Sequence, residues 1–150
     1  MERAAELLAA VEATGAGAFL ADTSPIIYRL ERTAPPRLVR ACDALFDAVQ
    51  EGKRGCIVSA VTVAELFVKP FAAGPAAVAT MDAFFRDPTI GIAEIDYDIA
   101  RTAARLVARL VRLPDALIAA TAIQFDLPIV TGDRRLARAV SNSILVADHA

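Results

Sequence analysis

The hydrophobic positions of the chain fall into two patterns: short unbroken apolar runs, and stretches with apolar residues at helical spacing. The unbroken runs predict five strands, over residues 17–22, 55–61, 89–95, 127–133 and 143–148. Helical spacing bounded by proline or glycine predicts helices over residues 2–14, 24–34, 37–50, 62–69, 75–86, 97–111, 114–126 and 134–140. Because the strands do not alternate polar and apolar residues, we expect both of their faces to be buried.

Strands that alternate with helices indicate a parallel sheet covered by helices on both sides. We therefore expect an α/β fold, a three-layer α/β/α sandwich around a central, mainly parallel sheet of about five strands. The length of 150 residues is typical of one domain, so residues 1–150 are predicted to form a single domain. Residues 1–17 are interpreted as an additional N-terminal helical extension.

Composition narrows the function classes only a little. Hydrophobic residues make up 56% of the chain and its mean hydropathy is +0.47, which favours an apolar surface covered by a partner or a second copy. The net charge of −2 gives no overall sign of nucleic-acid binding, so basic groups for RNA must be locally clustered. The two cysteines, Cys42 and Cys56, and the single histidine, His149, exclude a Cys/His zinc set.

The N-terminus carries three glutamates among its first twelve residues and does not resemble a signal peptide. No unbroken apolar stretch reaches the ~18 residues that a membrane span needs. Sparse, unpatterned cysteines suit a reducing compartment. We therefore expect a soluble, cytoplasmic protein that does not associate with a membrane.

Four acids follow the predicted strands. Asp22 ends the first strand, Glu65 lies one turn into the helix after the second, Asp115 follows Pro114 in a first helical turn, and Asp133 ends the fourth strand. Ligands of open parallel sheets bind at the carboxyl ends of strands, so we expect these acids to meet there. Crowded carboxylates repel one another unless a cation neutralises them. Oxygen ligands without His or Cys favour Mg²⁺ or Mn²⁺, the ions of phosphoryl chemistry.

Each acid also has an ordinary structural interpretation. Asp22 suits a turn, Glu65 suits a capping box that starts at Thr62, Asp115 suits the positive end of a helix dipole, and Asp133 suits a helix N-cap. Taken singly, these interpretations are the more common outcome. Four such residues at one edge of one sheet favour a shared site.

The segments that carry these acids are FLADTSPII (19–27), VSAVTVAELFVKP (58–70) and LPDALIAATAIQFDLPIVTGD (113–133). They resemble the PIN-domain ribonuclease family, and most of all the VapC-type toxins of bacterial toxin–antitoxin systems. The resemblance spans about residues 18–148. It implies a PIN-like sandwich and an endoribonuclease that uses Mg²⁺ or Mn²⁺, in which a metal-activated water hydrolyses RNA. It assigns the catalytic and metal-binding roles to Asp22, Glu65, Asp115 and Asp133.

The same resemblance implies frequent homodimers and a cognate antitoxin. One departure concerns Gly132, which stands where the family often has a larger polar residue. Hydroxyl groups beside the acids are expected to bond the carboxylates or a metal-bound water, or else to serve as ordinary turn and cap residues; they are Thr23, Ser24 and Thr131.

Arginines supply candidate substrate contacts. Arg134 and Arg135 lie beside Asp133, and Arg112 precedes Pro114. A row at helical spacing is predicted to share one face of the 97–111 helix and to face RNA phosphates, an antitoxin or solvent; it consists of Arg101, Arg105, Arg109 and Arg112. Aromatic residues near the 62–69 helix, of which an exposed subset would suit a groove for a partner helix, are Phe67, Phe71, Phe84 and Phe85.

The leading hypothesis is thus a Mg²⁺-dependent endoribonuclease that acts as the toxin of a type II toxin–antitoxin pair. A housekeeping RNA-processing PIN nuclease would carry the same four acids. A non-catalytic PIN-like module that binds RNA or protein is a second alternative, although all four acids are present. A phosphatase or receiver domain is disfavoured, because Asp22 has no acidic neighbour within two residues.

Overall fold

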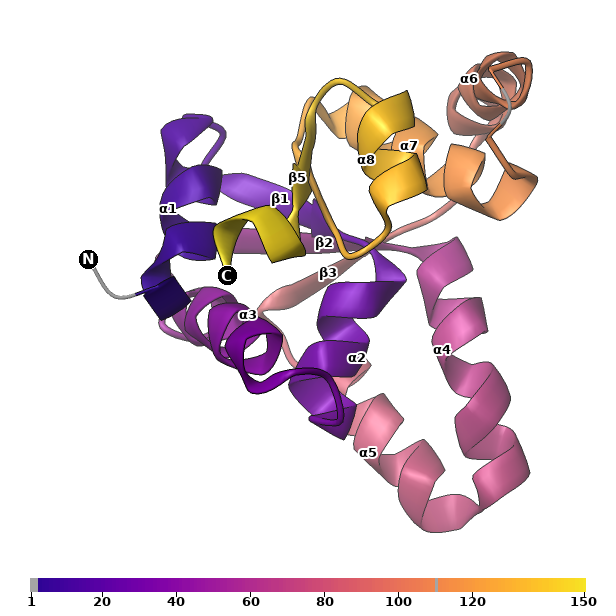
Figure 1. The fold of residues 1–150 in the computed structure, drawn as a ribbon. Coiled ribbons are helices and arrows are strands. Elements are labelled where there is room, and N and C mark those ends of the chain that lie inside the picture. The colour runs from indigo at the N-terminus through magenta and orange to yellow at the C-terminus, as the bar shows by residue number, and fades with distance from the viewer. Residues whose placement is uncertain (1–2, 110) are drawn as a thin grey trace.

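The central layer of the protein is a fully parallel sheet of five strands, seen in a computed structural model that describes residues 3–109 and 111–150 (Figure 1). The strands are β1 (Ala18–Ala21), β2 (Gly55–Ser59), β3 (Ile90–Ala93), β4 (Ile129–Thr131) and β5 (Ser143–Leu145). They lie in the order β3-β2-β1-β4-β5. From β1 the chain first adds β2 and β3 on one side and then returns to add β4 and β5 on the other, so the order of strands switches between β1 and β4. Such a switch point opens a crevice at the carboxyl ends of the strands.

Helices cover both faces of this sheet. They are α1 (Glu6–Ala13), α2 (Thr23–Glu31), α3 (Pro36–Gln50), α4 (Ala60–Ala73), α5 (Pro75–Arg86), α6 (Tyr97–Val107), α7 (Leu113–Phe125) and α8 (Arg134–Ala139). Short 3₁₀ helices, η1 (Arg3–Ala5) and η2 (Val146–His149), lie near the two ends of the chain. None of the helices among the described residues is long and apolar enough to cross a membrane.

The core forms as two layers, one on each face of the sheet. Along β1, Phe19 and Ala21 pack into the cluster formed with α1, α2 and α3, whereas Leu20 packs on the other face with α6 and α7. This alternation buries apolar side chains on both faces, because successive side chains of a strand point to opposite sides. The predicted three-layer α/β/α sandwich is confirmed.

The N-terminal helix is part of the core. Leu7 and Val11 of α1 are fully buried and belong to the same cluster as Phe19 of β1. The segment that we expected to be an extension therefore closes one end of the sandwich.

Several predicted boundaries were wrong. The predicted helix 62–69 begins earlier and runs past Pro70, because Ser59 accepts the Val61 amide at 3.1 Å as N-cap and Gly74 ends the helix at φ 129°. Pro70 removes the hydrogen bond that an N–H would donate and crowds the carbonyl of residue 66, yet the helix continues through it. All five strands are shorter than predicted, since apolar residues continue into the next turn or helix. The predicted helix 97–111 ends at Val107, and its Leu110 lies outside the described residues.

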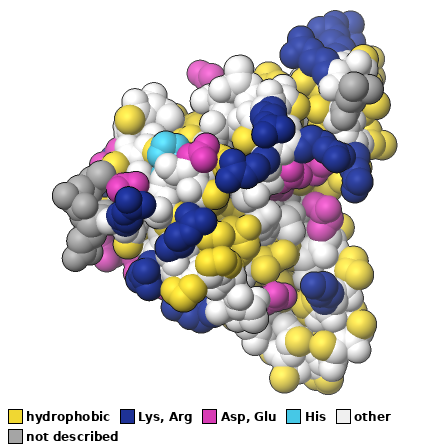
Figure 2. Space-filling model, viewed as in Figure 1, with side chains coloured by type: hydrophobic (Ala, Val, Ile, Leu, Met, Phe, Trp, Pro, Cys, Tyr) yellow, Lys and Arg dark blue, Asp and Glu magenta, His cyan; other side chains and the backbone are white. Residues whose placement is uncertain are grey.

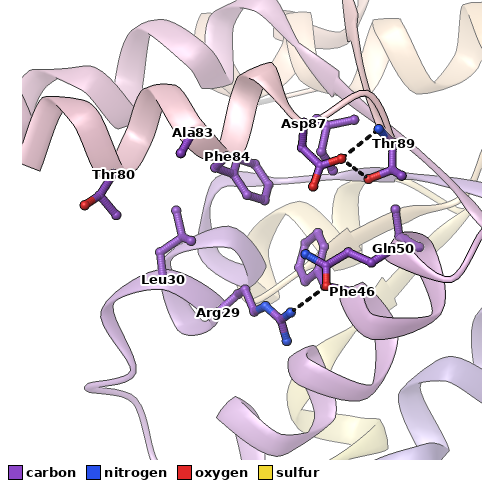
Figure 3. Close-up of a pocket in the computed structure, with 11 residues that line it drawn as sticks. Arg29, Leu30, Phe46, Gln50, Thr80, Ala83, Phe84, Asp87 and Thr89 are labelled. Carbon is purple, nitrogen blue, oxygen red and sulfur yellow. Dashed lines mark hydrogen bonds between the residues drawn. The ribbon is translucent and has the colours of Figure 1, made fainter.

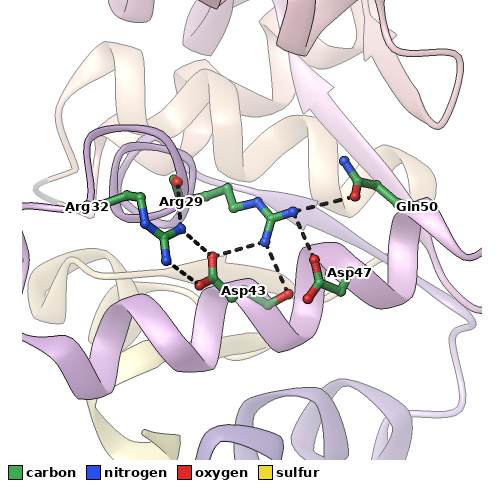
Figure 4. Close-up of polar contacts among 5 residues, drawn as sticks. All are labelled: Arg29, Arg32, Asp43, Asp47 and Gln50. Carbon is green, nitrogen blue, oxygen red and sulfur yellow. Dashed lines mark hydrogen bonds and ion pairs between the residues drawn. The ribbon is translucent and has the colours of Figure 1, made fainter.

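An ion-pair network fixes α2 against α3 (Figure 4). Arg29 bonds Asp43 and Asp47, both at 2.9 Å, and Arg32 bonds Asp43 at 2.8 Å. The bonds from Arg32, and then from Arg29, hold the pKa of Asp43 below its usual value. Networks of this kind stabilise more than isolated surface pairs do. The network anchors α2, whose first turn carries part of the acidic edge described below.

Candidate active site

Asp22 lies directly after β1, at the N-terminus of α2, and is 5% exposed. Its side chain makes no capping bond to the helix. Instead its Oδ2 accepts a 2.7 Å hydrogen bond from Thr131 Oγ1 at the end of the neighbouring strand β4. Burial raises the pKa of Asp22, the Thr131 bond partly offsets this, and the charges of Asp115 and Asp133 raise it further. Asp22 is therefore a buried carboxyl group that forms no ion pair with the Lys and Arg side chains of the described residues.

Glu65 is not the partner in a capping box. The helix starts at Ala60, so Thr62 is buried inside it, and its hydroxyl finds no partner among the described residues. Glu65 instead accepts a 3.2 Å hydrogen bond from Thr23 Oγ1 in the first turn of α2. Partial burial raises the pKa of Glu65, the Thr23 bond lowers it, and the charges of Asp22 and Asp115 raise it. Glu65 therefore does not play the capping-box role that the sequence suggested.

Asp115 and Asp133 keep their ordinary structural roles. Asp115 lies in the first turn of α7, and Asp133 caps α8 by accepting the amides of Arg135 and Leu136 through Oδ1, at 2.8 and 3.3 Å. Burial, and then the charge of Asp133, raise the pKa of Asp115, while Arg112 and Arg135 lower it. Both residues nonetheless lie close enough to Asp22 to raise its pKa.

The four predicted acids thus come together at the carboxyl edge of the sheet. Asp22 is influenced by Asp115 and Asp133, and Glu65 by Asp22 and Asp115. Within residues 3–109 and 111–150, however, no three acidic, cysteine or histidine side chains are grouped tightly enough to hold an ion as they stand. The donor set contains only oxygen and fits a hard divalent cation. Binding one would require the carboxylates to draw closer together.

The cysteines take no part in this edge. Cys42 and Cys56 are buried in the core as free thiols. Burial raises the pKa of each to about 12, so neither is a thiolate nucleophile near neutral pH.

Gly132 is explained by its neighbours. A Cβ atom at this position would lie 2.6 Å from Tyr28 Oη and 2.8 Å from Ser24 Cβ, closer than real contacts allow. Burial is the main factor that raises the pKa of Tyr28, and a hydrogen bond with Ser24 lowers it. Ser24, predicted to bond a carboxylate or a metal-bound water or to serve as a turn residue, hydrogen-bonds Tyr28. Sequence reasoning gave Tyr28 no place near the acids; the signal was the missing side chain at Gly132.

The arginines of the predicted helical row are divided between elements. Arg101 and Arg105 are exposed on α6, whereas Arg112 precedes α7 as its N-cap residue, so the prediction of one shared helix face was wrong. Lys and Arg side chains gather over α6 and α8 (Figure 2). Beneath them lies an open groove of about 700 Å³, lined by Arg109, Arg134, Arg135, Arg138 and Ala139.

An apolar surface lies on the other side of the acids. Val68 and Phe71 of α4 are 68% and 71% exposed, while Phe85 is buried and Phe67 and Phe84 are half-buried. A groove of about 340 Å³ runs between α2, α4 and α5, and its lining includes Thr23 and Glu65 of the acidic edge. The apolar groove and the acids are therefore continuous.

A third cavity, of about 230 Å³, lies between α2, α3 and α5 (Figure 3). Phe46 and Phe84 form its apolar side, and Arg29 and Gln50 line its polar side. It lies toward the C-terminal end of α2, and none of the four acids lines it.

The parallel 3-2-1-4-5 sheet between two helical layers, with acids at its switch point, defines the class as a PIN-like α/β/α fold. The family model described as PIN domain matches residues 19–141, and the chain belongs to the PIN domain family. The predicted family resemblance is thereby confirmed. Among curated proteins, no match was found.

Several solved structures share this fold. FitAcB from Neisseria gonorrhoeae has a TM-score of 0.68 at 23% identity, covering 88% of this chain and 99% of that one. VapBC2 from Rickettsia felis, bound to a promoter DNA fragment, gives 0.66 at 17% identity, with coverage of 85% and 96%. A toxin–antitoxin complex from Klebsiella pneumoniae gives 0.64 at 21% identity, with coverage of 85% and 97%. At these identities, the neighbours show that this chain shares their fold.

Proposed function

We propose that this protein is a Mg²⁺-dependent endoribonuclease and the toxin of a type II toxin–antitoxin pair. The observation that carries the proposal is the convergence of four carboxyl groups, from the ends of β1 and β4 and from α4 and α7, at one edge of the sheet. Three of them, Asp22, Glu65 and Asp115, have a pKa that is raised mainly by burial and further by neighbouring acids, a pattern that is common at functional sites.

Asp22, Glu65, Asp115 and Asp133 would hold Mg²⁺, with Mn²⁺ as a substitute. When bound, the ion supplies the positive charge that activates water and stabilises the phosphate oxygens. The protein's own hydrogen bonds orient the ligands: Thr131 holds Asp22, Thr23 holds Glu65, and the first amides of α8 hold Asp133. Oriented ligands of this kind tune both metal affinity and rate.

Glu65 is suited to move the proton of the attacking water. It is the exposed member of the four acids, and Thr23 occupies only its Oε1. Arg112, Arg134 and Arg135 lie at the edges of α7 and α8 beside the acids, where they suit contacts with the phosphates of the substrate.

The exposed apolar surface favours a toxin over a housekeeping nuclease, which would use the same acids. A toxin needs a docking surface for its antitoxin, and Val68 and Phe71 offer apolar anchors beside a groove that reaches Glu65. An amphipathic helix laid into this groove is the expected binding mode. The high mean hydropathy of +0.47 also supports a homodimer. We place the protein in the cytoplasm with its RNA substrate.

RNA cleavage tests the proposal. Purified protein and a mixed RNA pool are incubated with Mg²⁺ or EDTA, beside Asp115→Asn and the matched control Asp126→Asn. Asp126 lies at the other end of α7 in the left-handed conformation, which asparagine tolerates, so the control makes the same charge change away from the acids. We expect Mg²⁺-dependent cleavage that falls at least about 100-fold in Asp115→Asn and is unchanged in Asp126→Asn. Equal cleavage by wild type and Asp115→Asn would refute the proposal.

A further inference from the structure

The groove between the end of α6 and α8 is lined by side chains that are not among the four acids of the proposed metal site. Four arginines, from the turn after α6 and from α8, face a volume of about 700 Å³. We propose that this arginine groove binds the phosphate backbone of the RNA substrate on one side of the cleaved bond. The inference rests on the proposed function and adds the path that the substrate takes to the acids.

The arginines of the groove are exposed and mostly lack acidic partners. Arg134 pairs with Asp148 at 3.8 Å, whereas Arg109, Arg135 and Arg138 have no carboxylate within 4.0 Å among the described residues. Like charges held this close repel one another and gain from a shared polyanion. The guanidinium fork also matches the oxygens of a phosphate better than an ammonium group does.

The arginine groove is continuous with the acidic edge. The backbone amide of Arg135, which lines the groove, donates to Asp133 Oδ1 at 2.8 Å. A strand that lies in the groove therefore reaches the acids without leaving positively charged surface. The opposite side of the acids, around Val68 and Leu66, is largely apolar, although its lining also includes Lys69.

The composition of the groove favours RNA over an acidic protein segment. Its lining has one small apolar side chain, Ala139, and no large one. Protein segments depend on buried apolar or aromatic anchors for affinity. Contacts with a nucleic-acid backbone depend on charge alone and carry no sequence information. We therefore expect the groove to add affinity for RNA of any sequence.

Binding in the absence of cleavage tests the inference. A short labelled single-stranded RNA is titrated in EDTA with wild type, with the Arg109→Ala/Arg138→Ala variant, and with a control that removes two exposed arginines elsewhere, Arg40→Ala/Arg86→Ala. We expect the groove variant to bind roughly tenfold more weakly and the control to bind like wild type. The plot of log affinity against log salt should flatten by about 1.4 for two lost phosphate contacts. Thermal unfolding checks that both variants are folded.

The outcomes separate this inference from the proposed function. If the groove variant binds RNA like wild type, or loses affinity only as much as the control, the inference is overturned even where Mg²⁺-dependent cleavage is observed. If the groove variant alone loses affinity with a flatter salt dependence, the inference holds even where no RNA is cleaved. A groove variant that keeps its RNA affinity but no longer binds an antitoxin would assign the groove to the protein partner and overturn the inference.

Discussion

Two surfaces flank the acidic edge, and they differ in chemistry. On the α8 side lies the arginine groove, with four guanidinium groups and a single alanine. On the α4 side lies the apolar groove, whose lining includes the mostly exposed Val68 and, at its border with the acids, Glu65. Phe71, also mostly exposed, lies on the same helix beside it. Figure 2 shows the same contrast, with basic side chains over α6 and α8 and apolar ones over α4 and α5.

This difference suggests that the two surfaces bind different partners. Charge without apolar anchors suits a polymer that presents the same phosphate at every step. Apolar side chains on a helix suit one protein partner that buries them. Because Glu65 lines the apolar groove and none of the four acids lines the arginine groove, a partner bound on the α4 side would cover Glu65 while the arginine groove stayed open.

The largest effect is expected from a variant that disrupts only the apolar surface of α4. Phe71→Asp places a charge where an antitoxin helix would bury an aromatic ring, so we expect affinity for the proposed antitoxin to fall at least about 100-fold. RNA cleavage should stay at the wild-type level, because Phe71 is 71% exposed and distant from the arginine groove. Calorimetric titration and a cleavage assay measure the two effects. Unchanged antitoxin affinity would remove the partner role of this surface.

A smaller effect is expected between the two surfaces, at Gly132. Gly132→Ala pushes a methyl group into Tyr28 and Ser24, and we expect the free energy of unfolding to fall by about 1–3 kcal/mol. Gly91→Ala is the matched control, since a Cβ there would meet its nearest atoms at 3.5 Å, an ordinary contact. Urea unfolding measures both. Equal free energies of unfolding for the two variants would show that Tyr28 and Ser24 can move aside without loss of stability, and would contradict the prediction.

The smallest effect concerns pH. A carboxyl group whose pKa is raised by folding stabilises the folded state at pH values below its ordinary pKa, which is 3.8 for Asp22 and Asp115 and 4.5 for Glu65. This stabilisation is lost as the pH rises through the raised pKa. In EDTA, the stability of wild type relative to Asp22→Asn should therefore fall as pH rises from about 4 toward neutrality. Asp43, whose pKa is lowered, acts in the opposite direction but is common to both proteins. Urea unfolding across this pH range gives the difference; a rise with pH would contradict it.

The position of the acids was predictable because strand direction decides it. Asp22 and Asp133 follow strands that pair in parallel, with Ala21 beside Val130, so their carboxyl ends had to meet. Glu65 was harder to interpret, because Thr62 offers a capping pattern that the structure does not use. Ser59, three residues earlier, caps the helix instead.

Contacts between distant elements could not be predicted. Gly132 and Tyr28 meet only because α2 packs beside the end of β4, and no local pattern encodes that distance. The row of arginines was misassigned for a related reason: α6 ends at Val107 without a glycine or proline to mark it. Pro70 led to a predicted helix that was too short. The packing of α4 against α2 and α5 outweighs the cost of a proline inside the helix.

The most direct measurement is thermal unfolding of wild type and Asp22→Asn against Mg²⁺ concentration, with Asp126→Asn as control. If the four acids share one ion, wild type gains about 1.4 kcal/mol at a tenfold excess over Kd, a rise in Tm of about 4 °C, and the control does the same. Asp22→Asn should start with a higher Tm than wild type in EDTA, because it removes a buried charge, and should gain little from Mg²⁺. A lower Tm for Asp22→Asn in EDTA, with an equal gain from Mg²⁺ in all three proteins, would contradict a metal site at this edge.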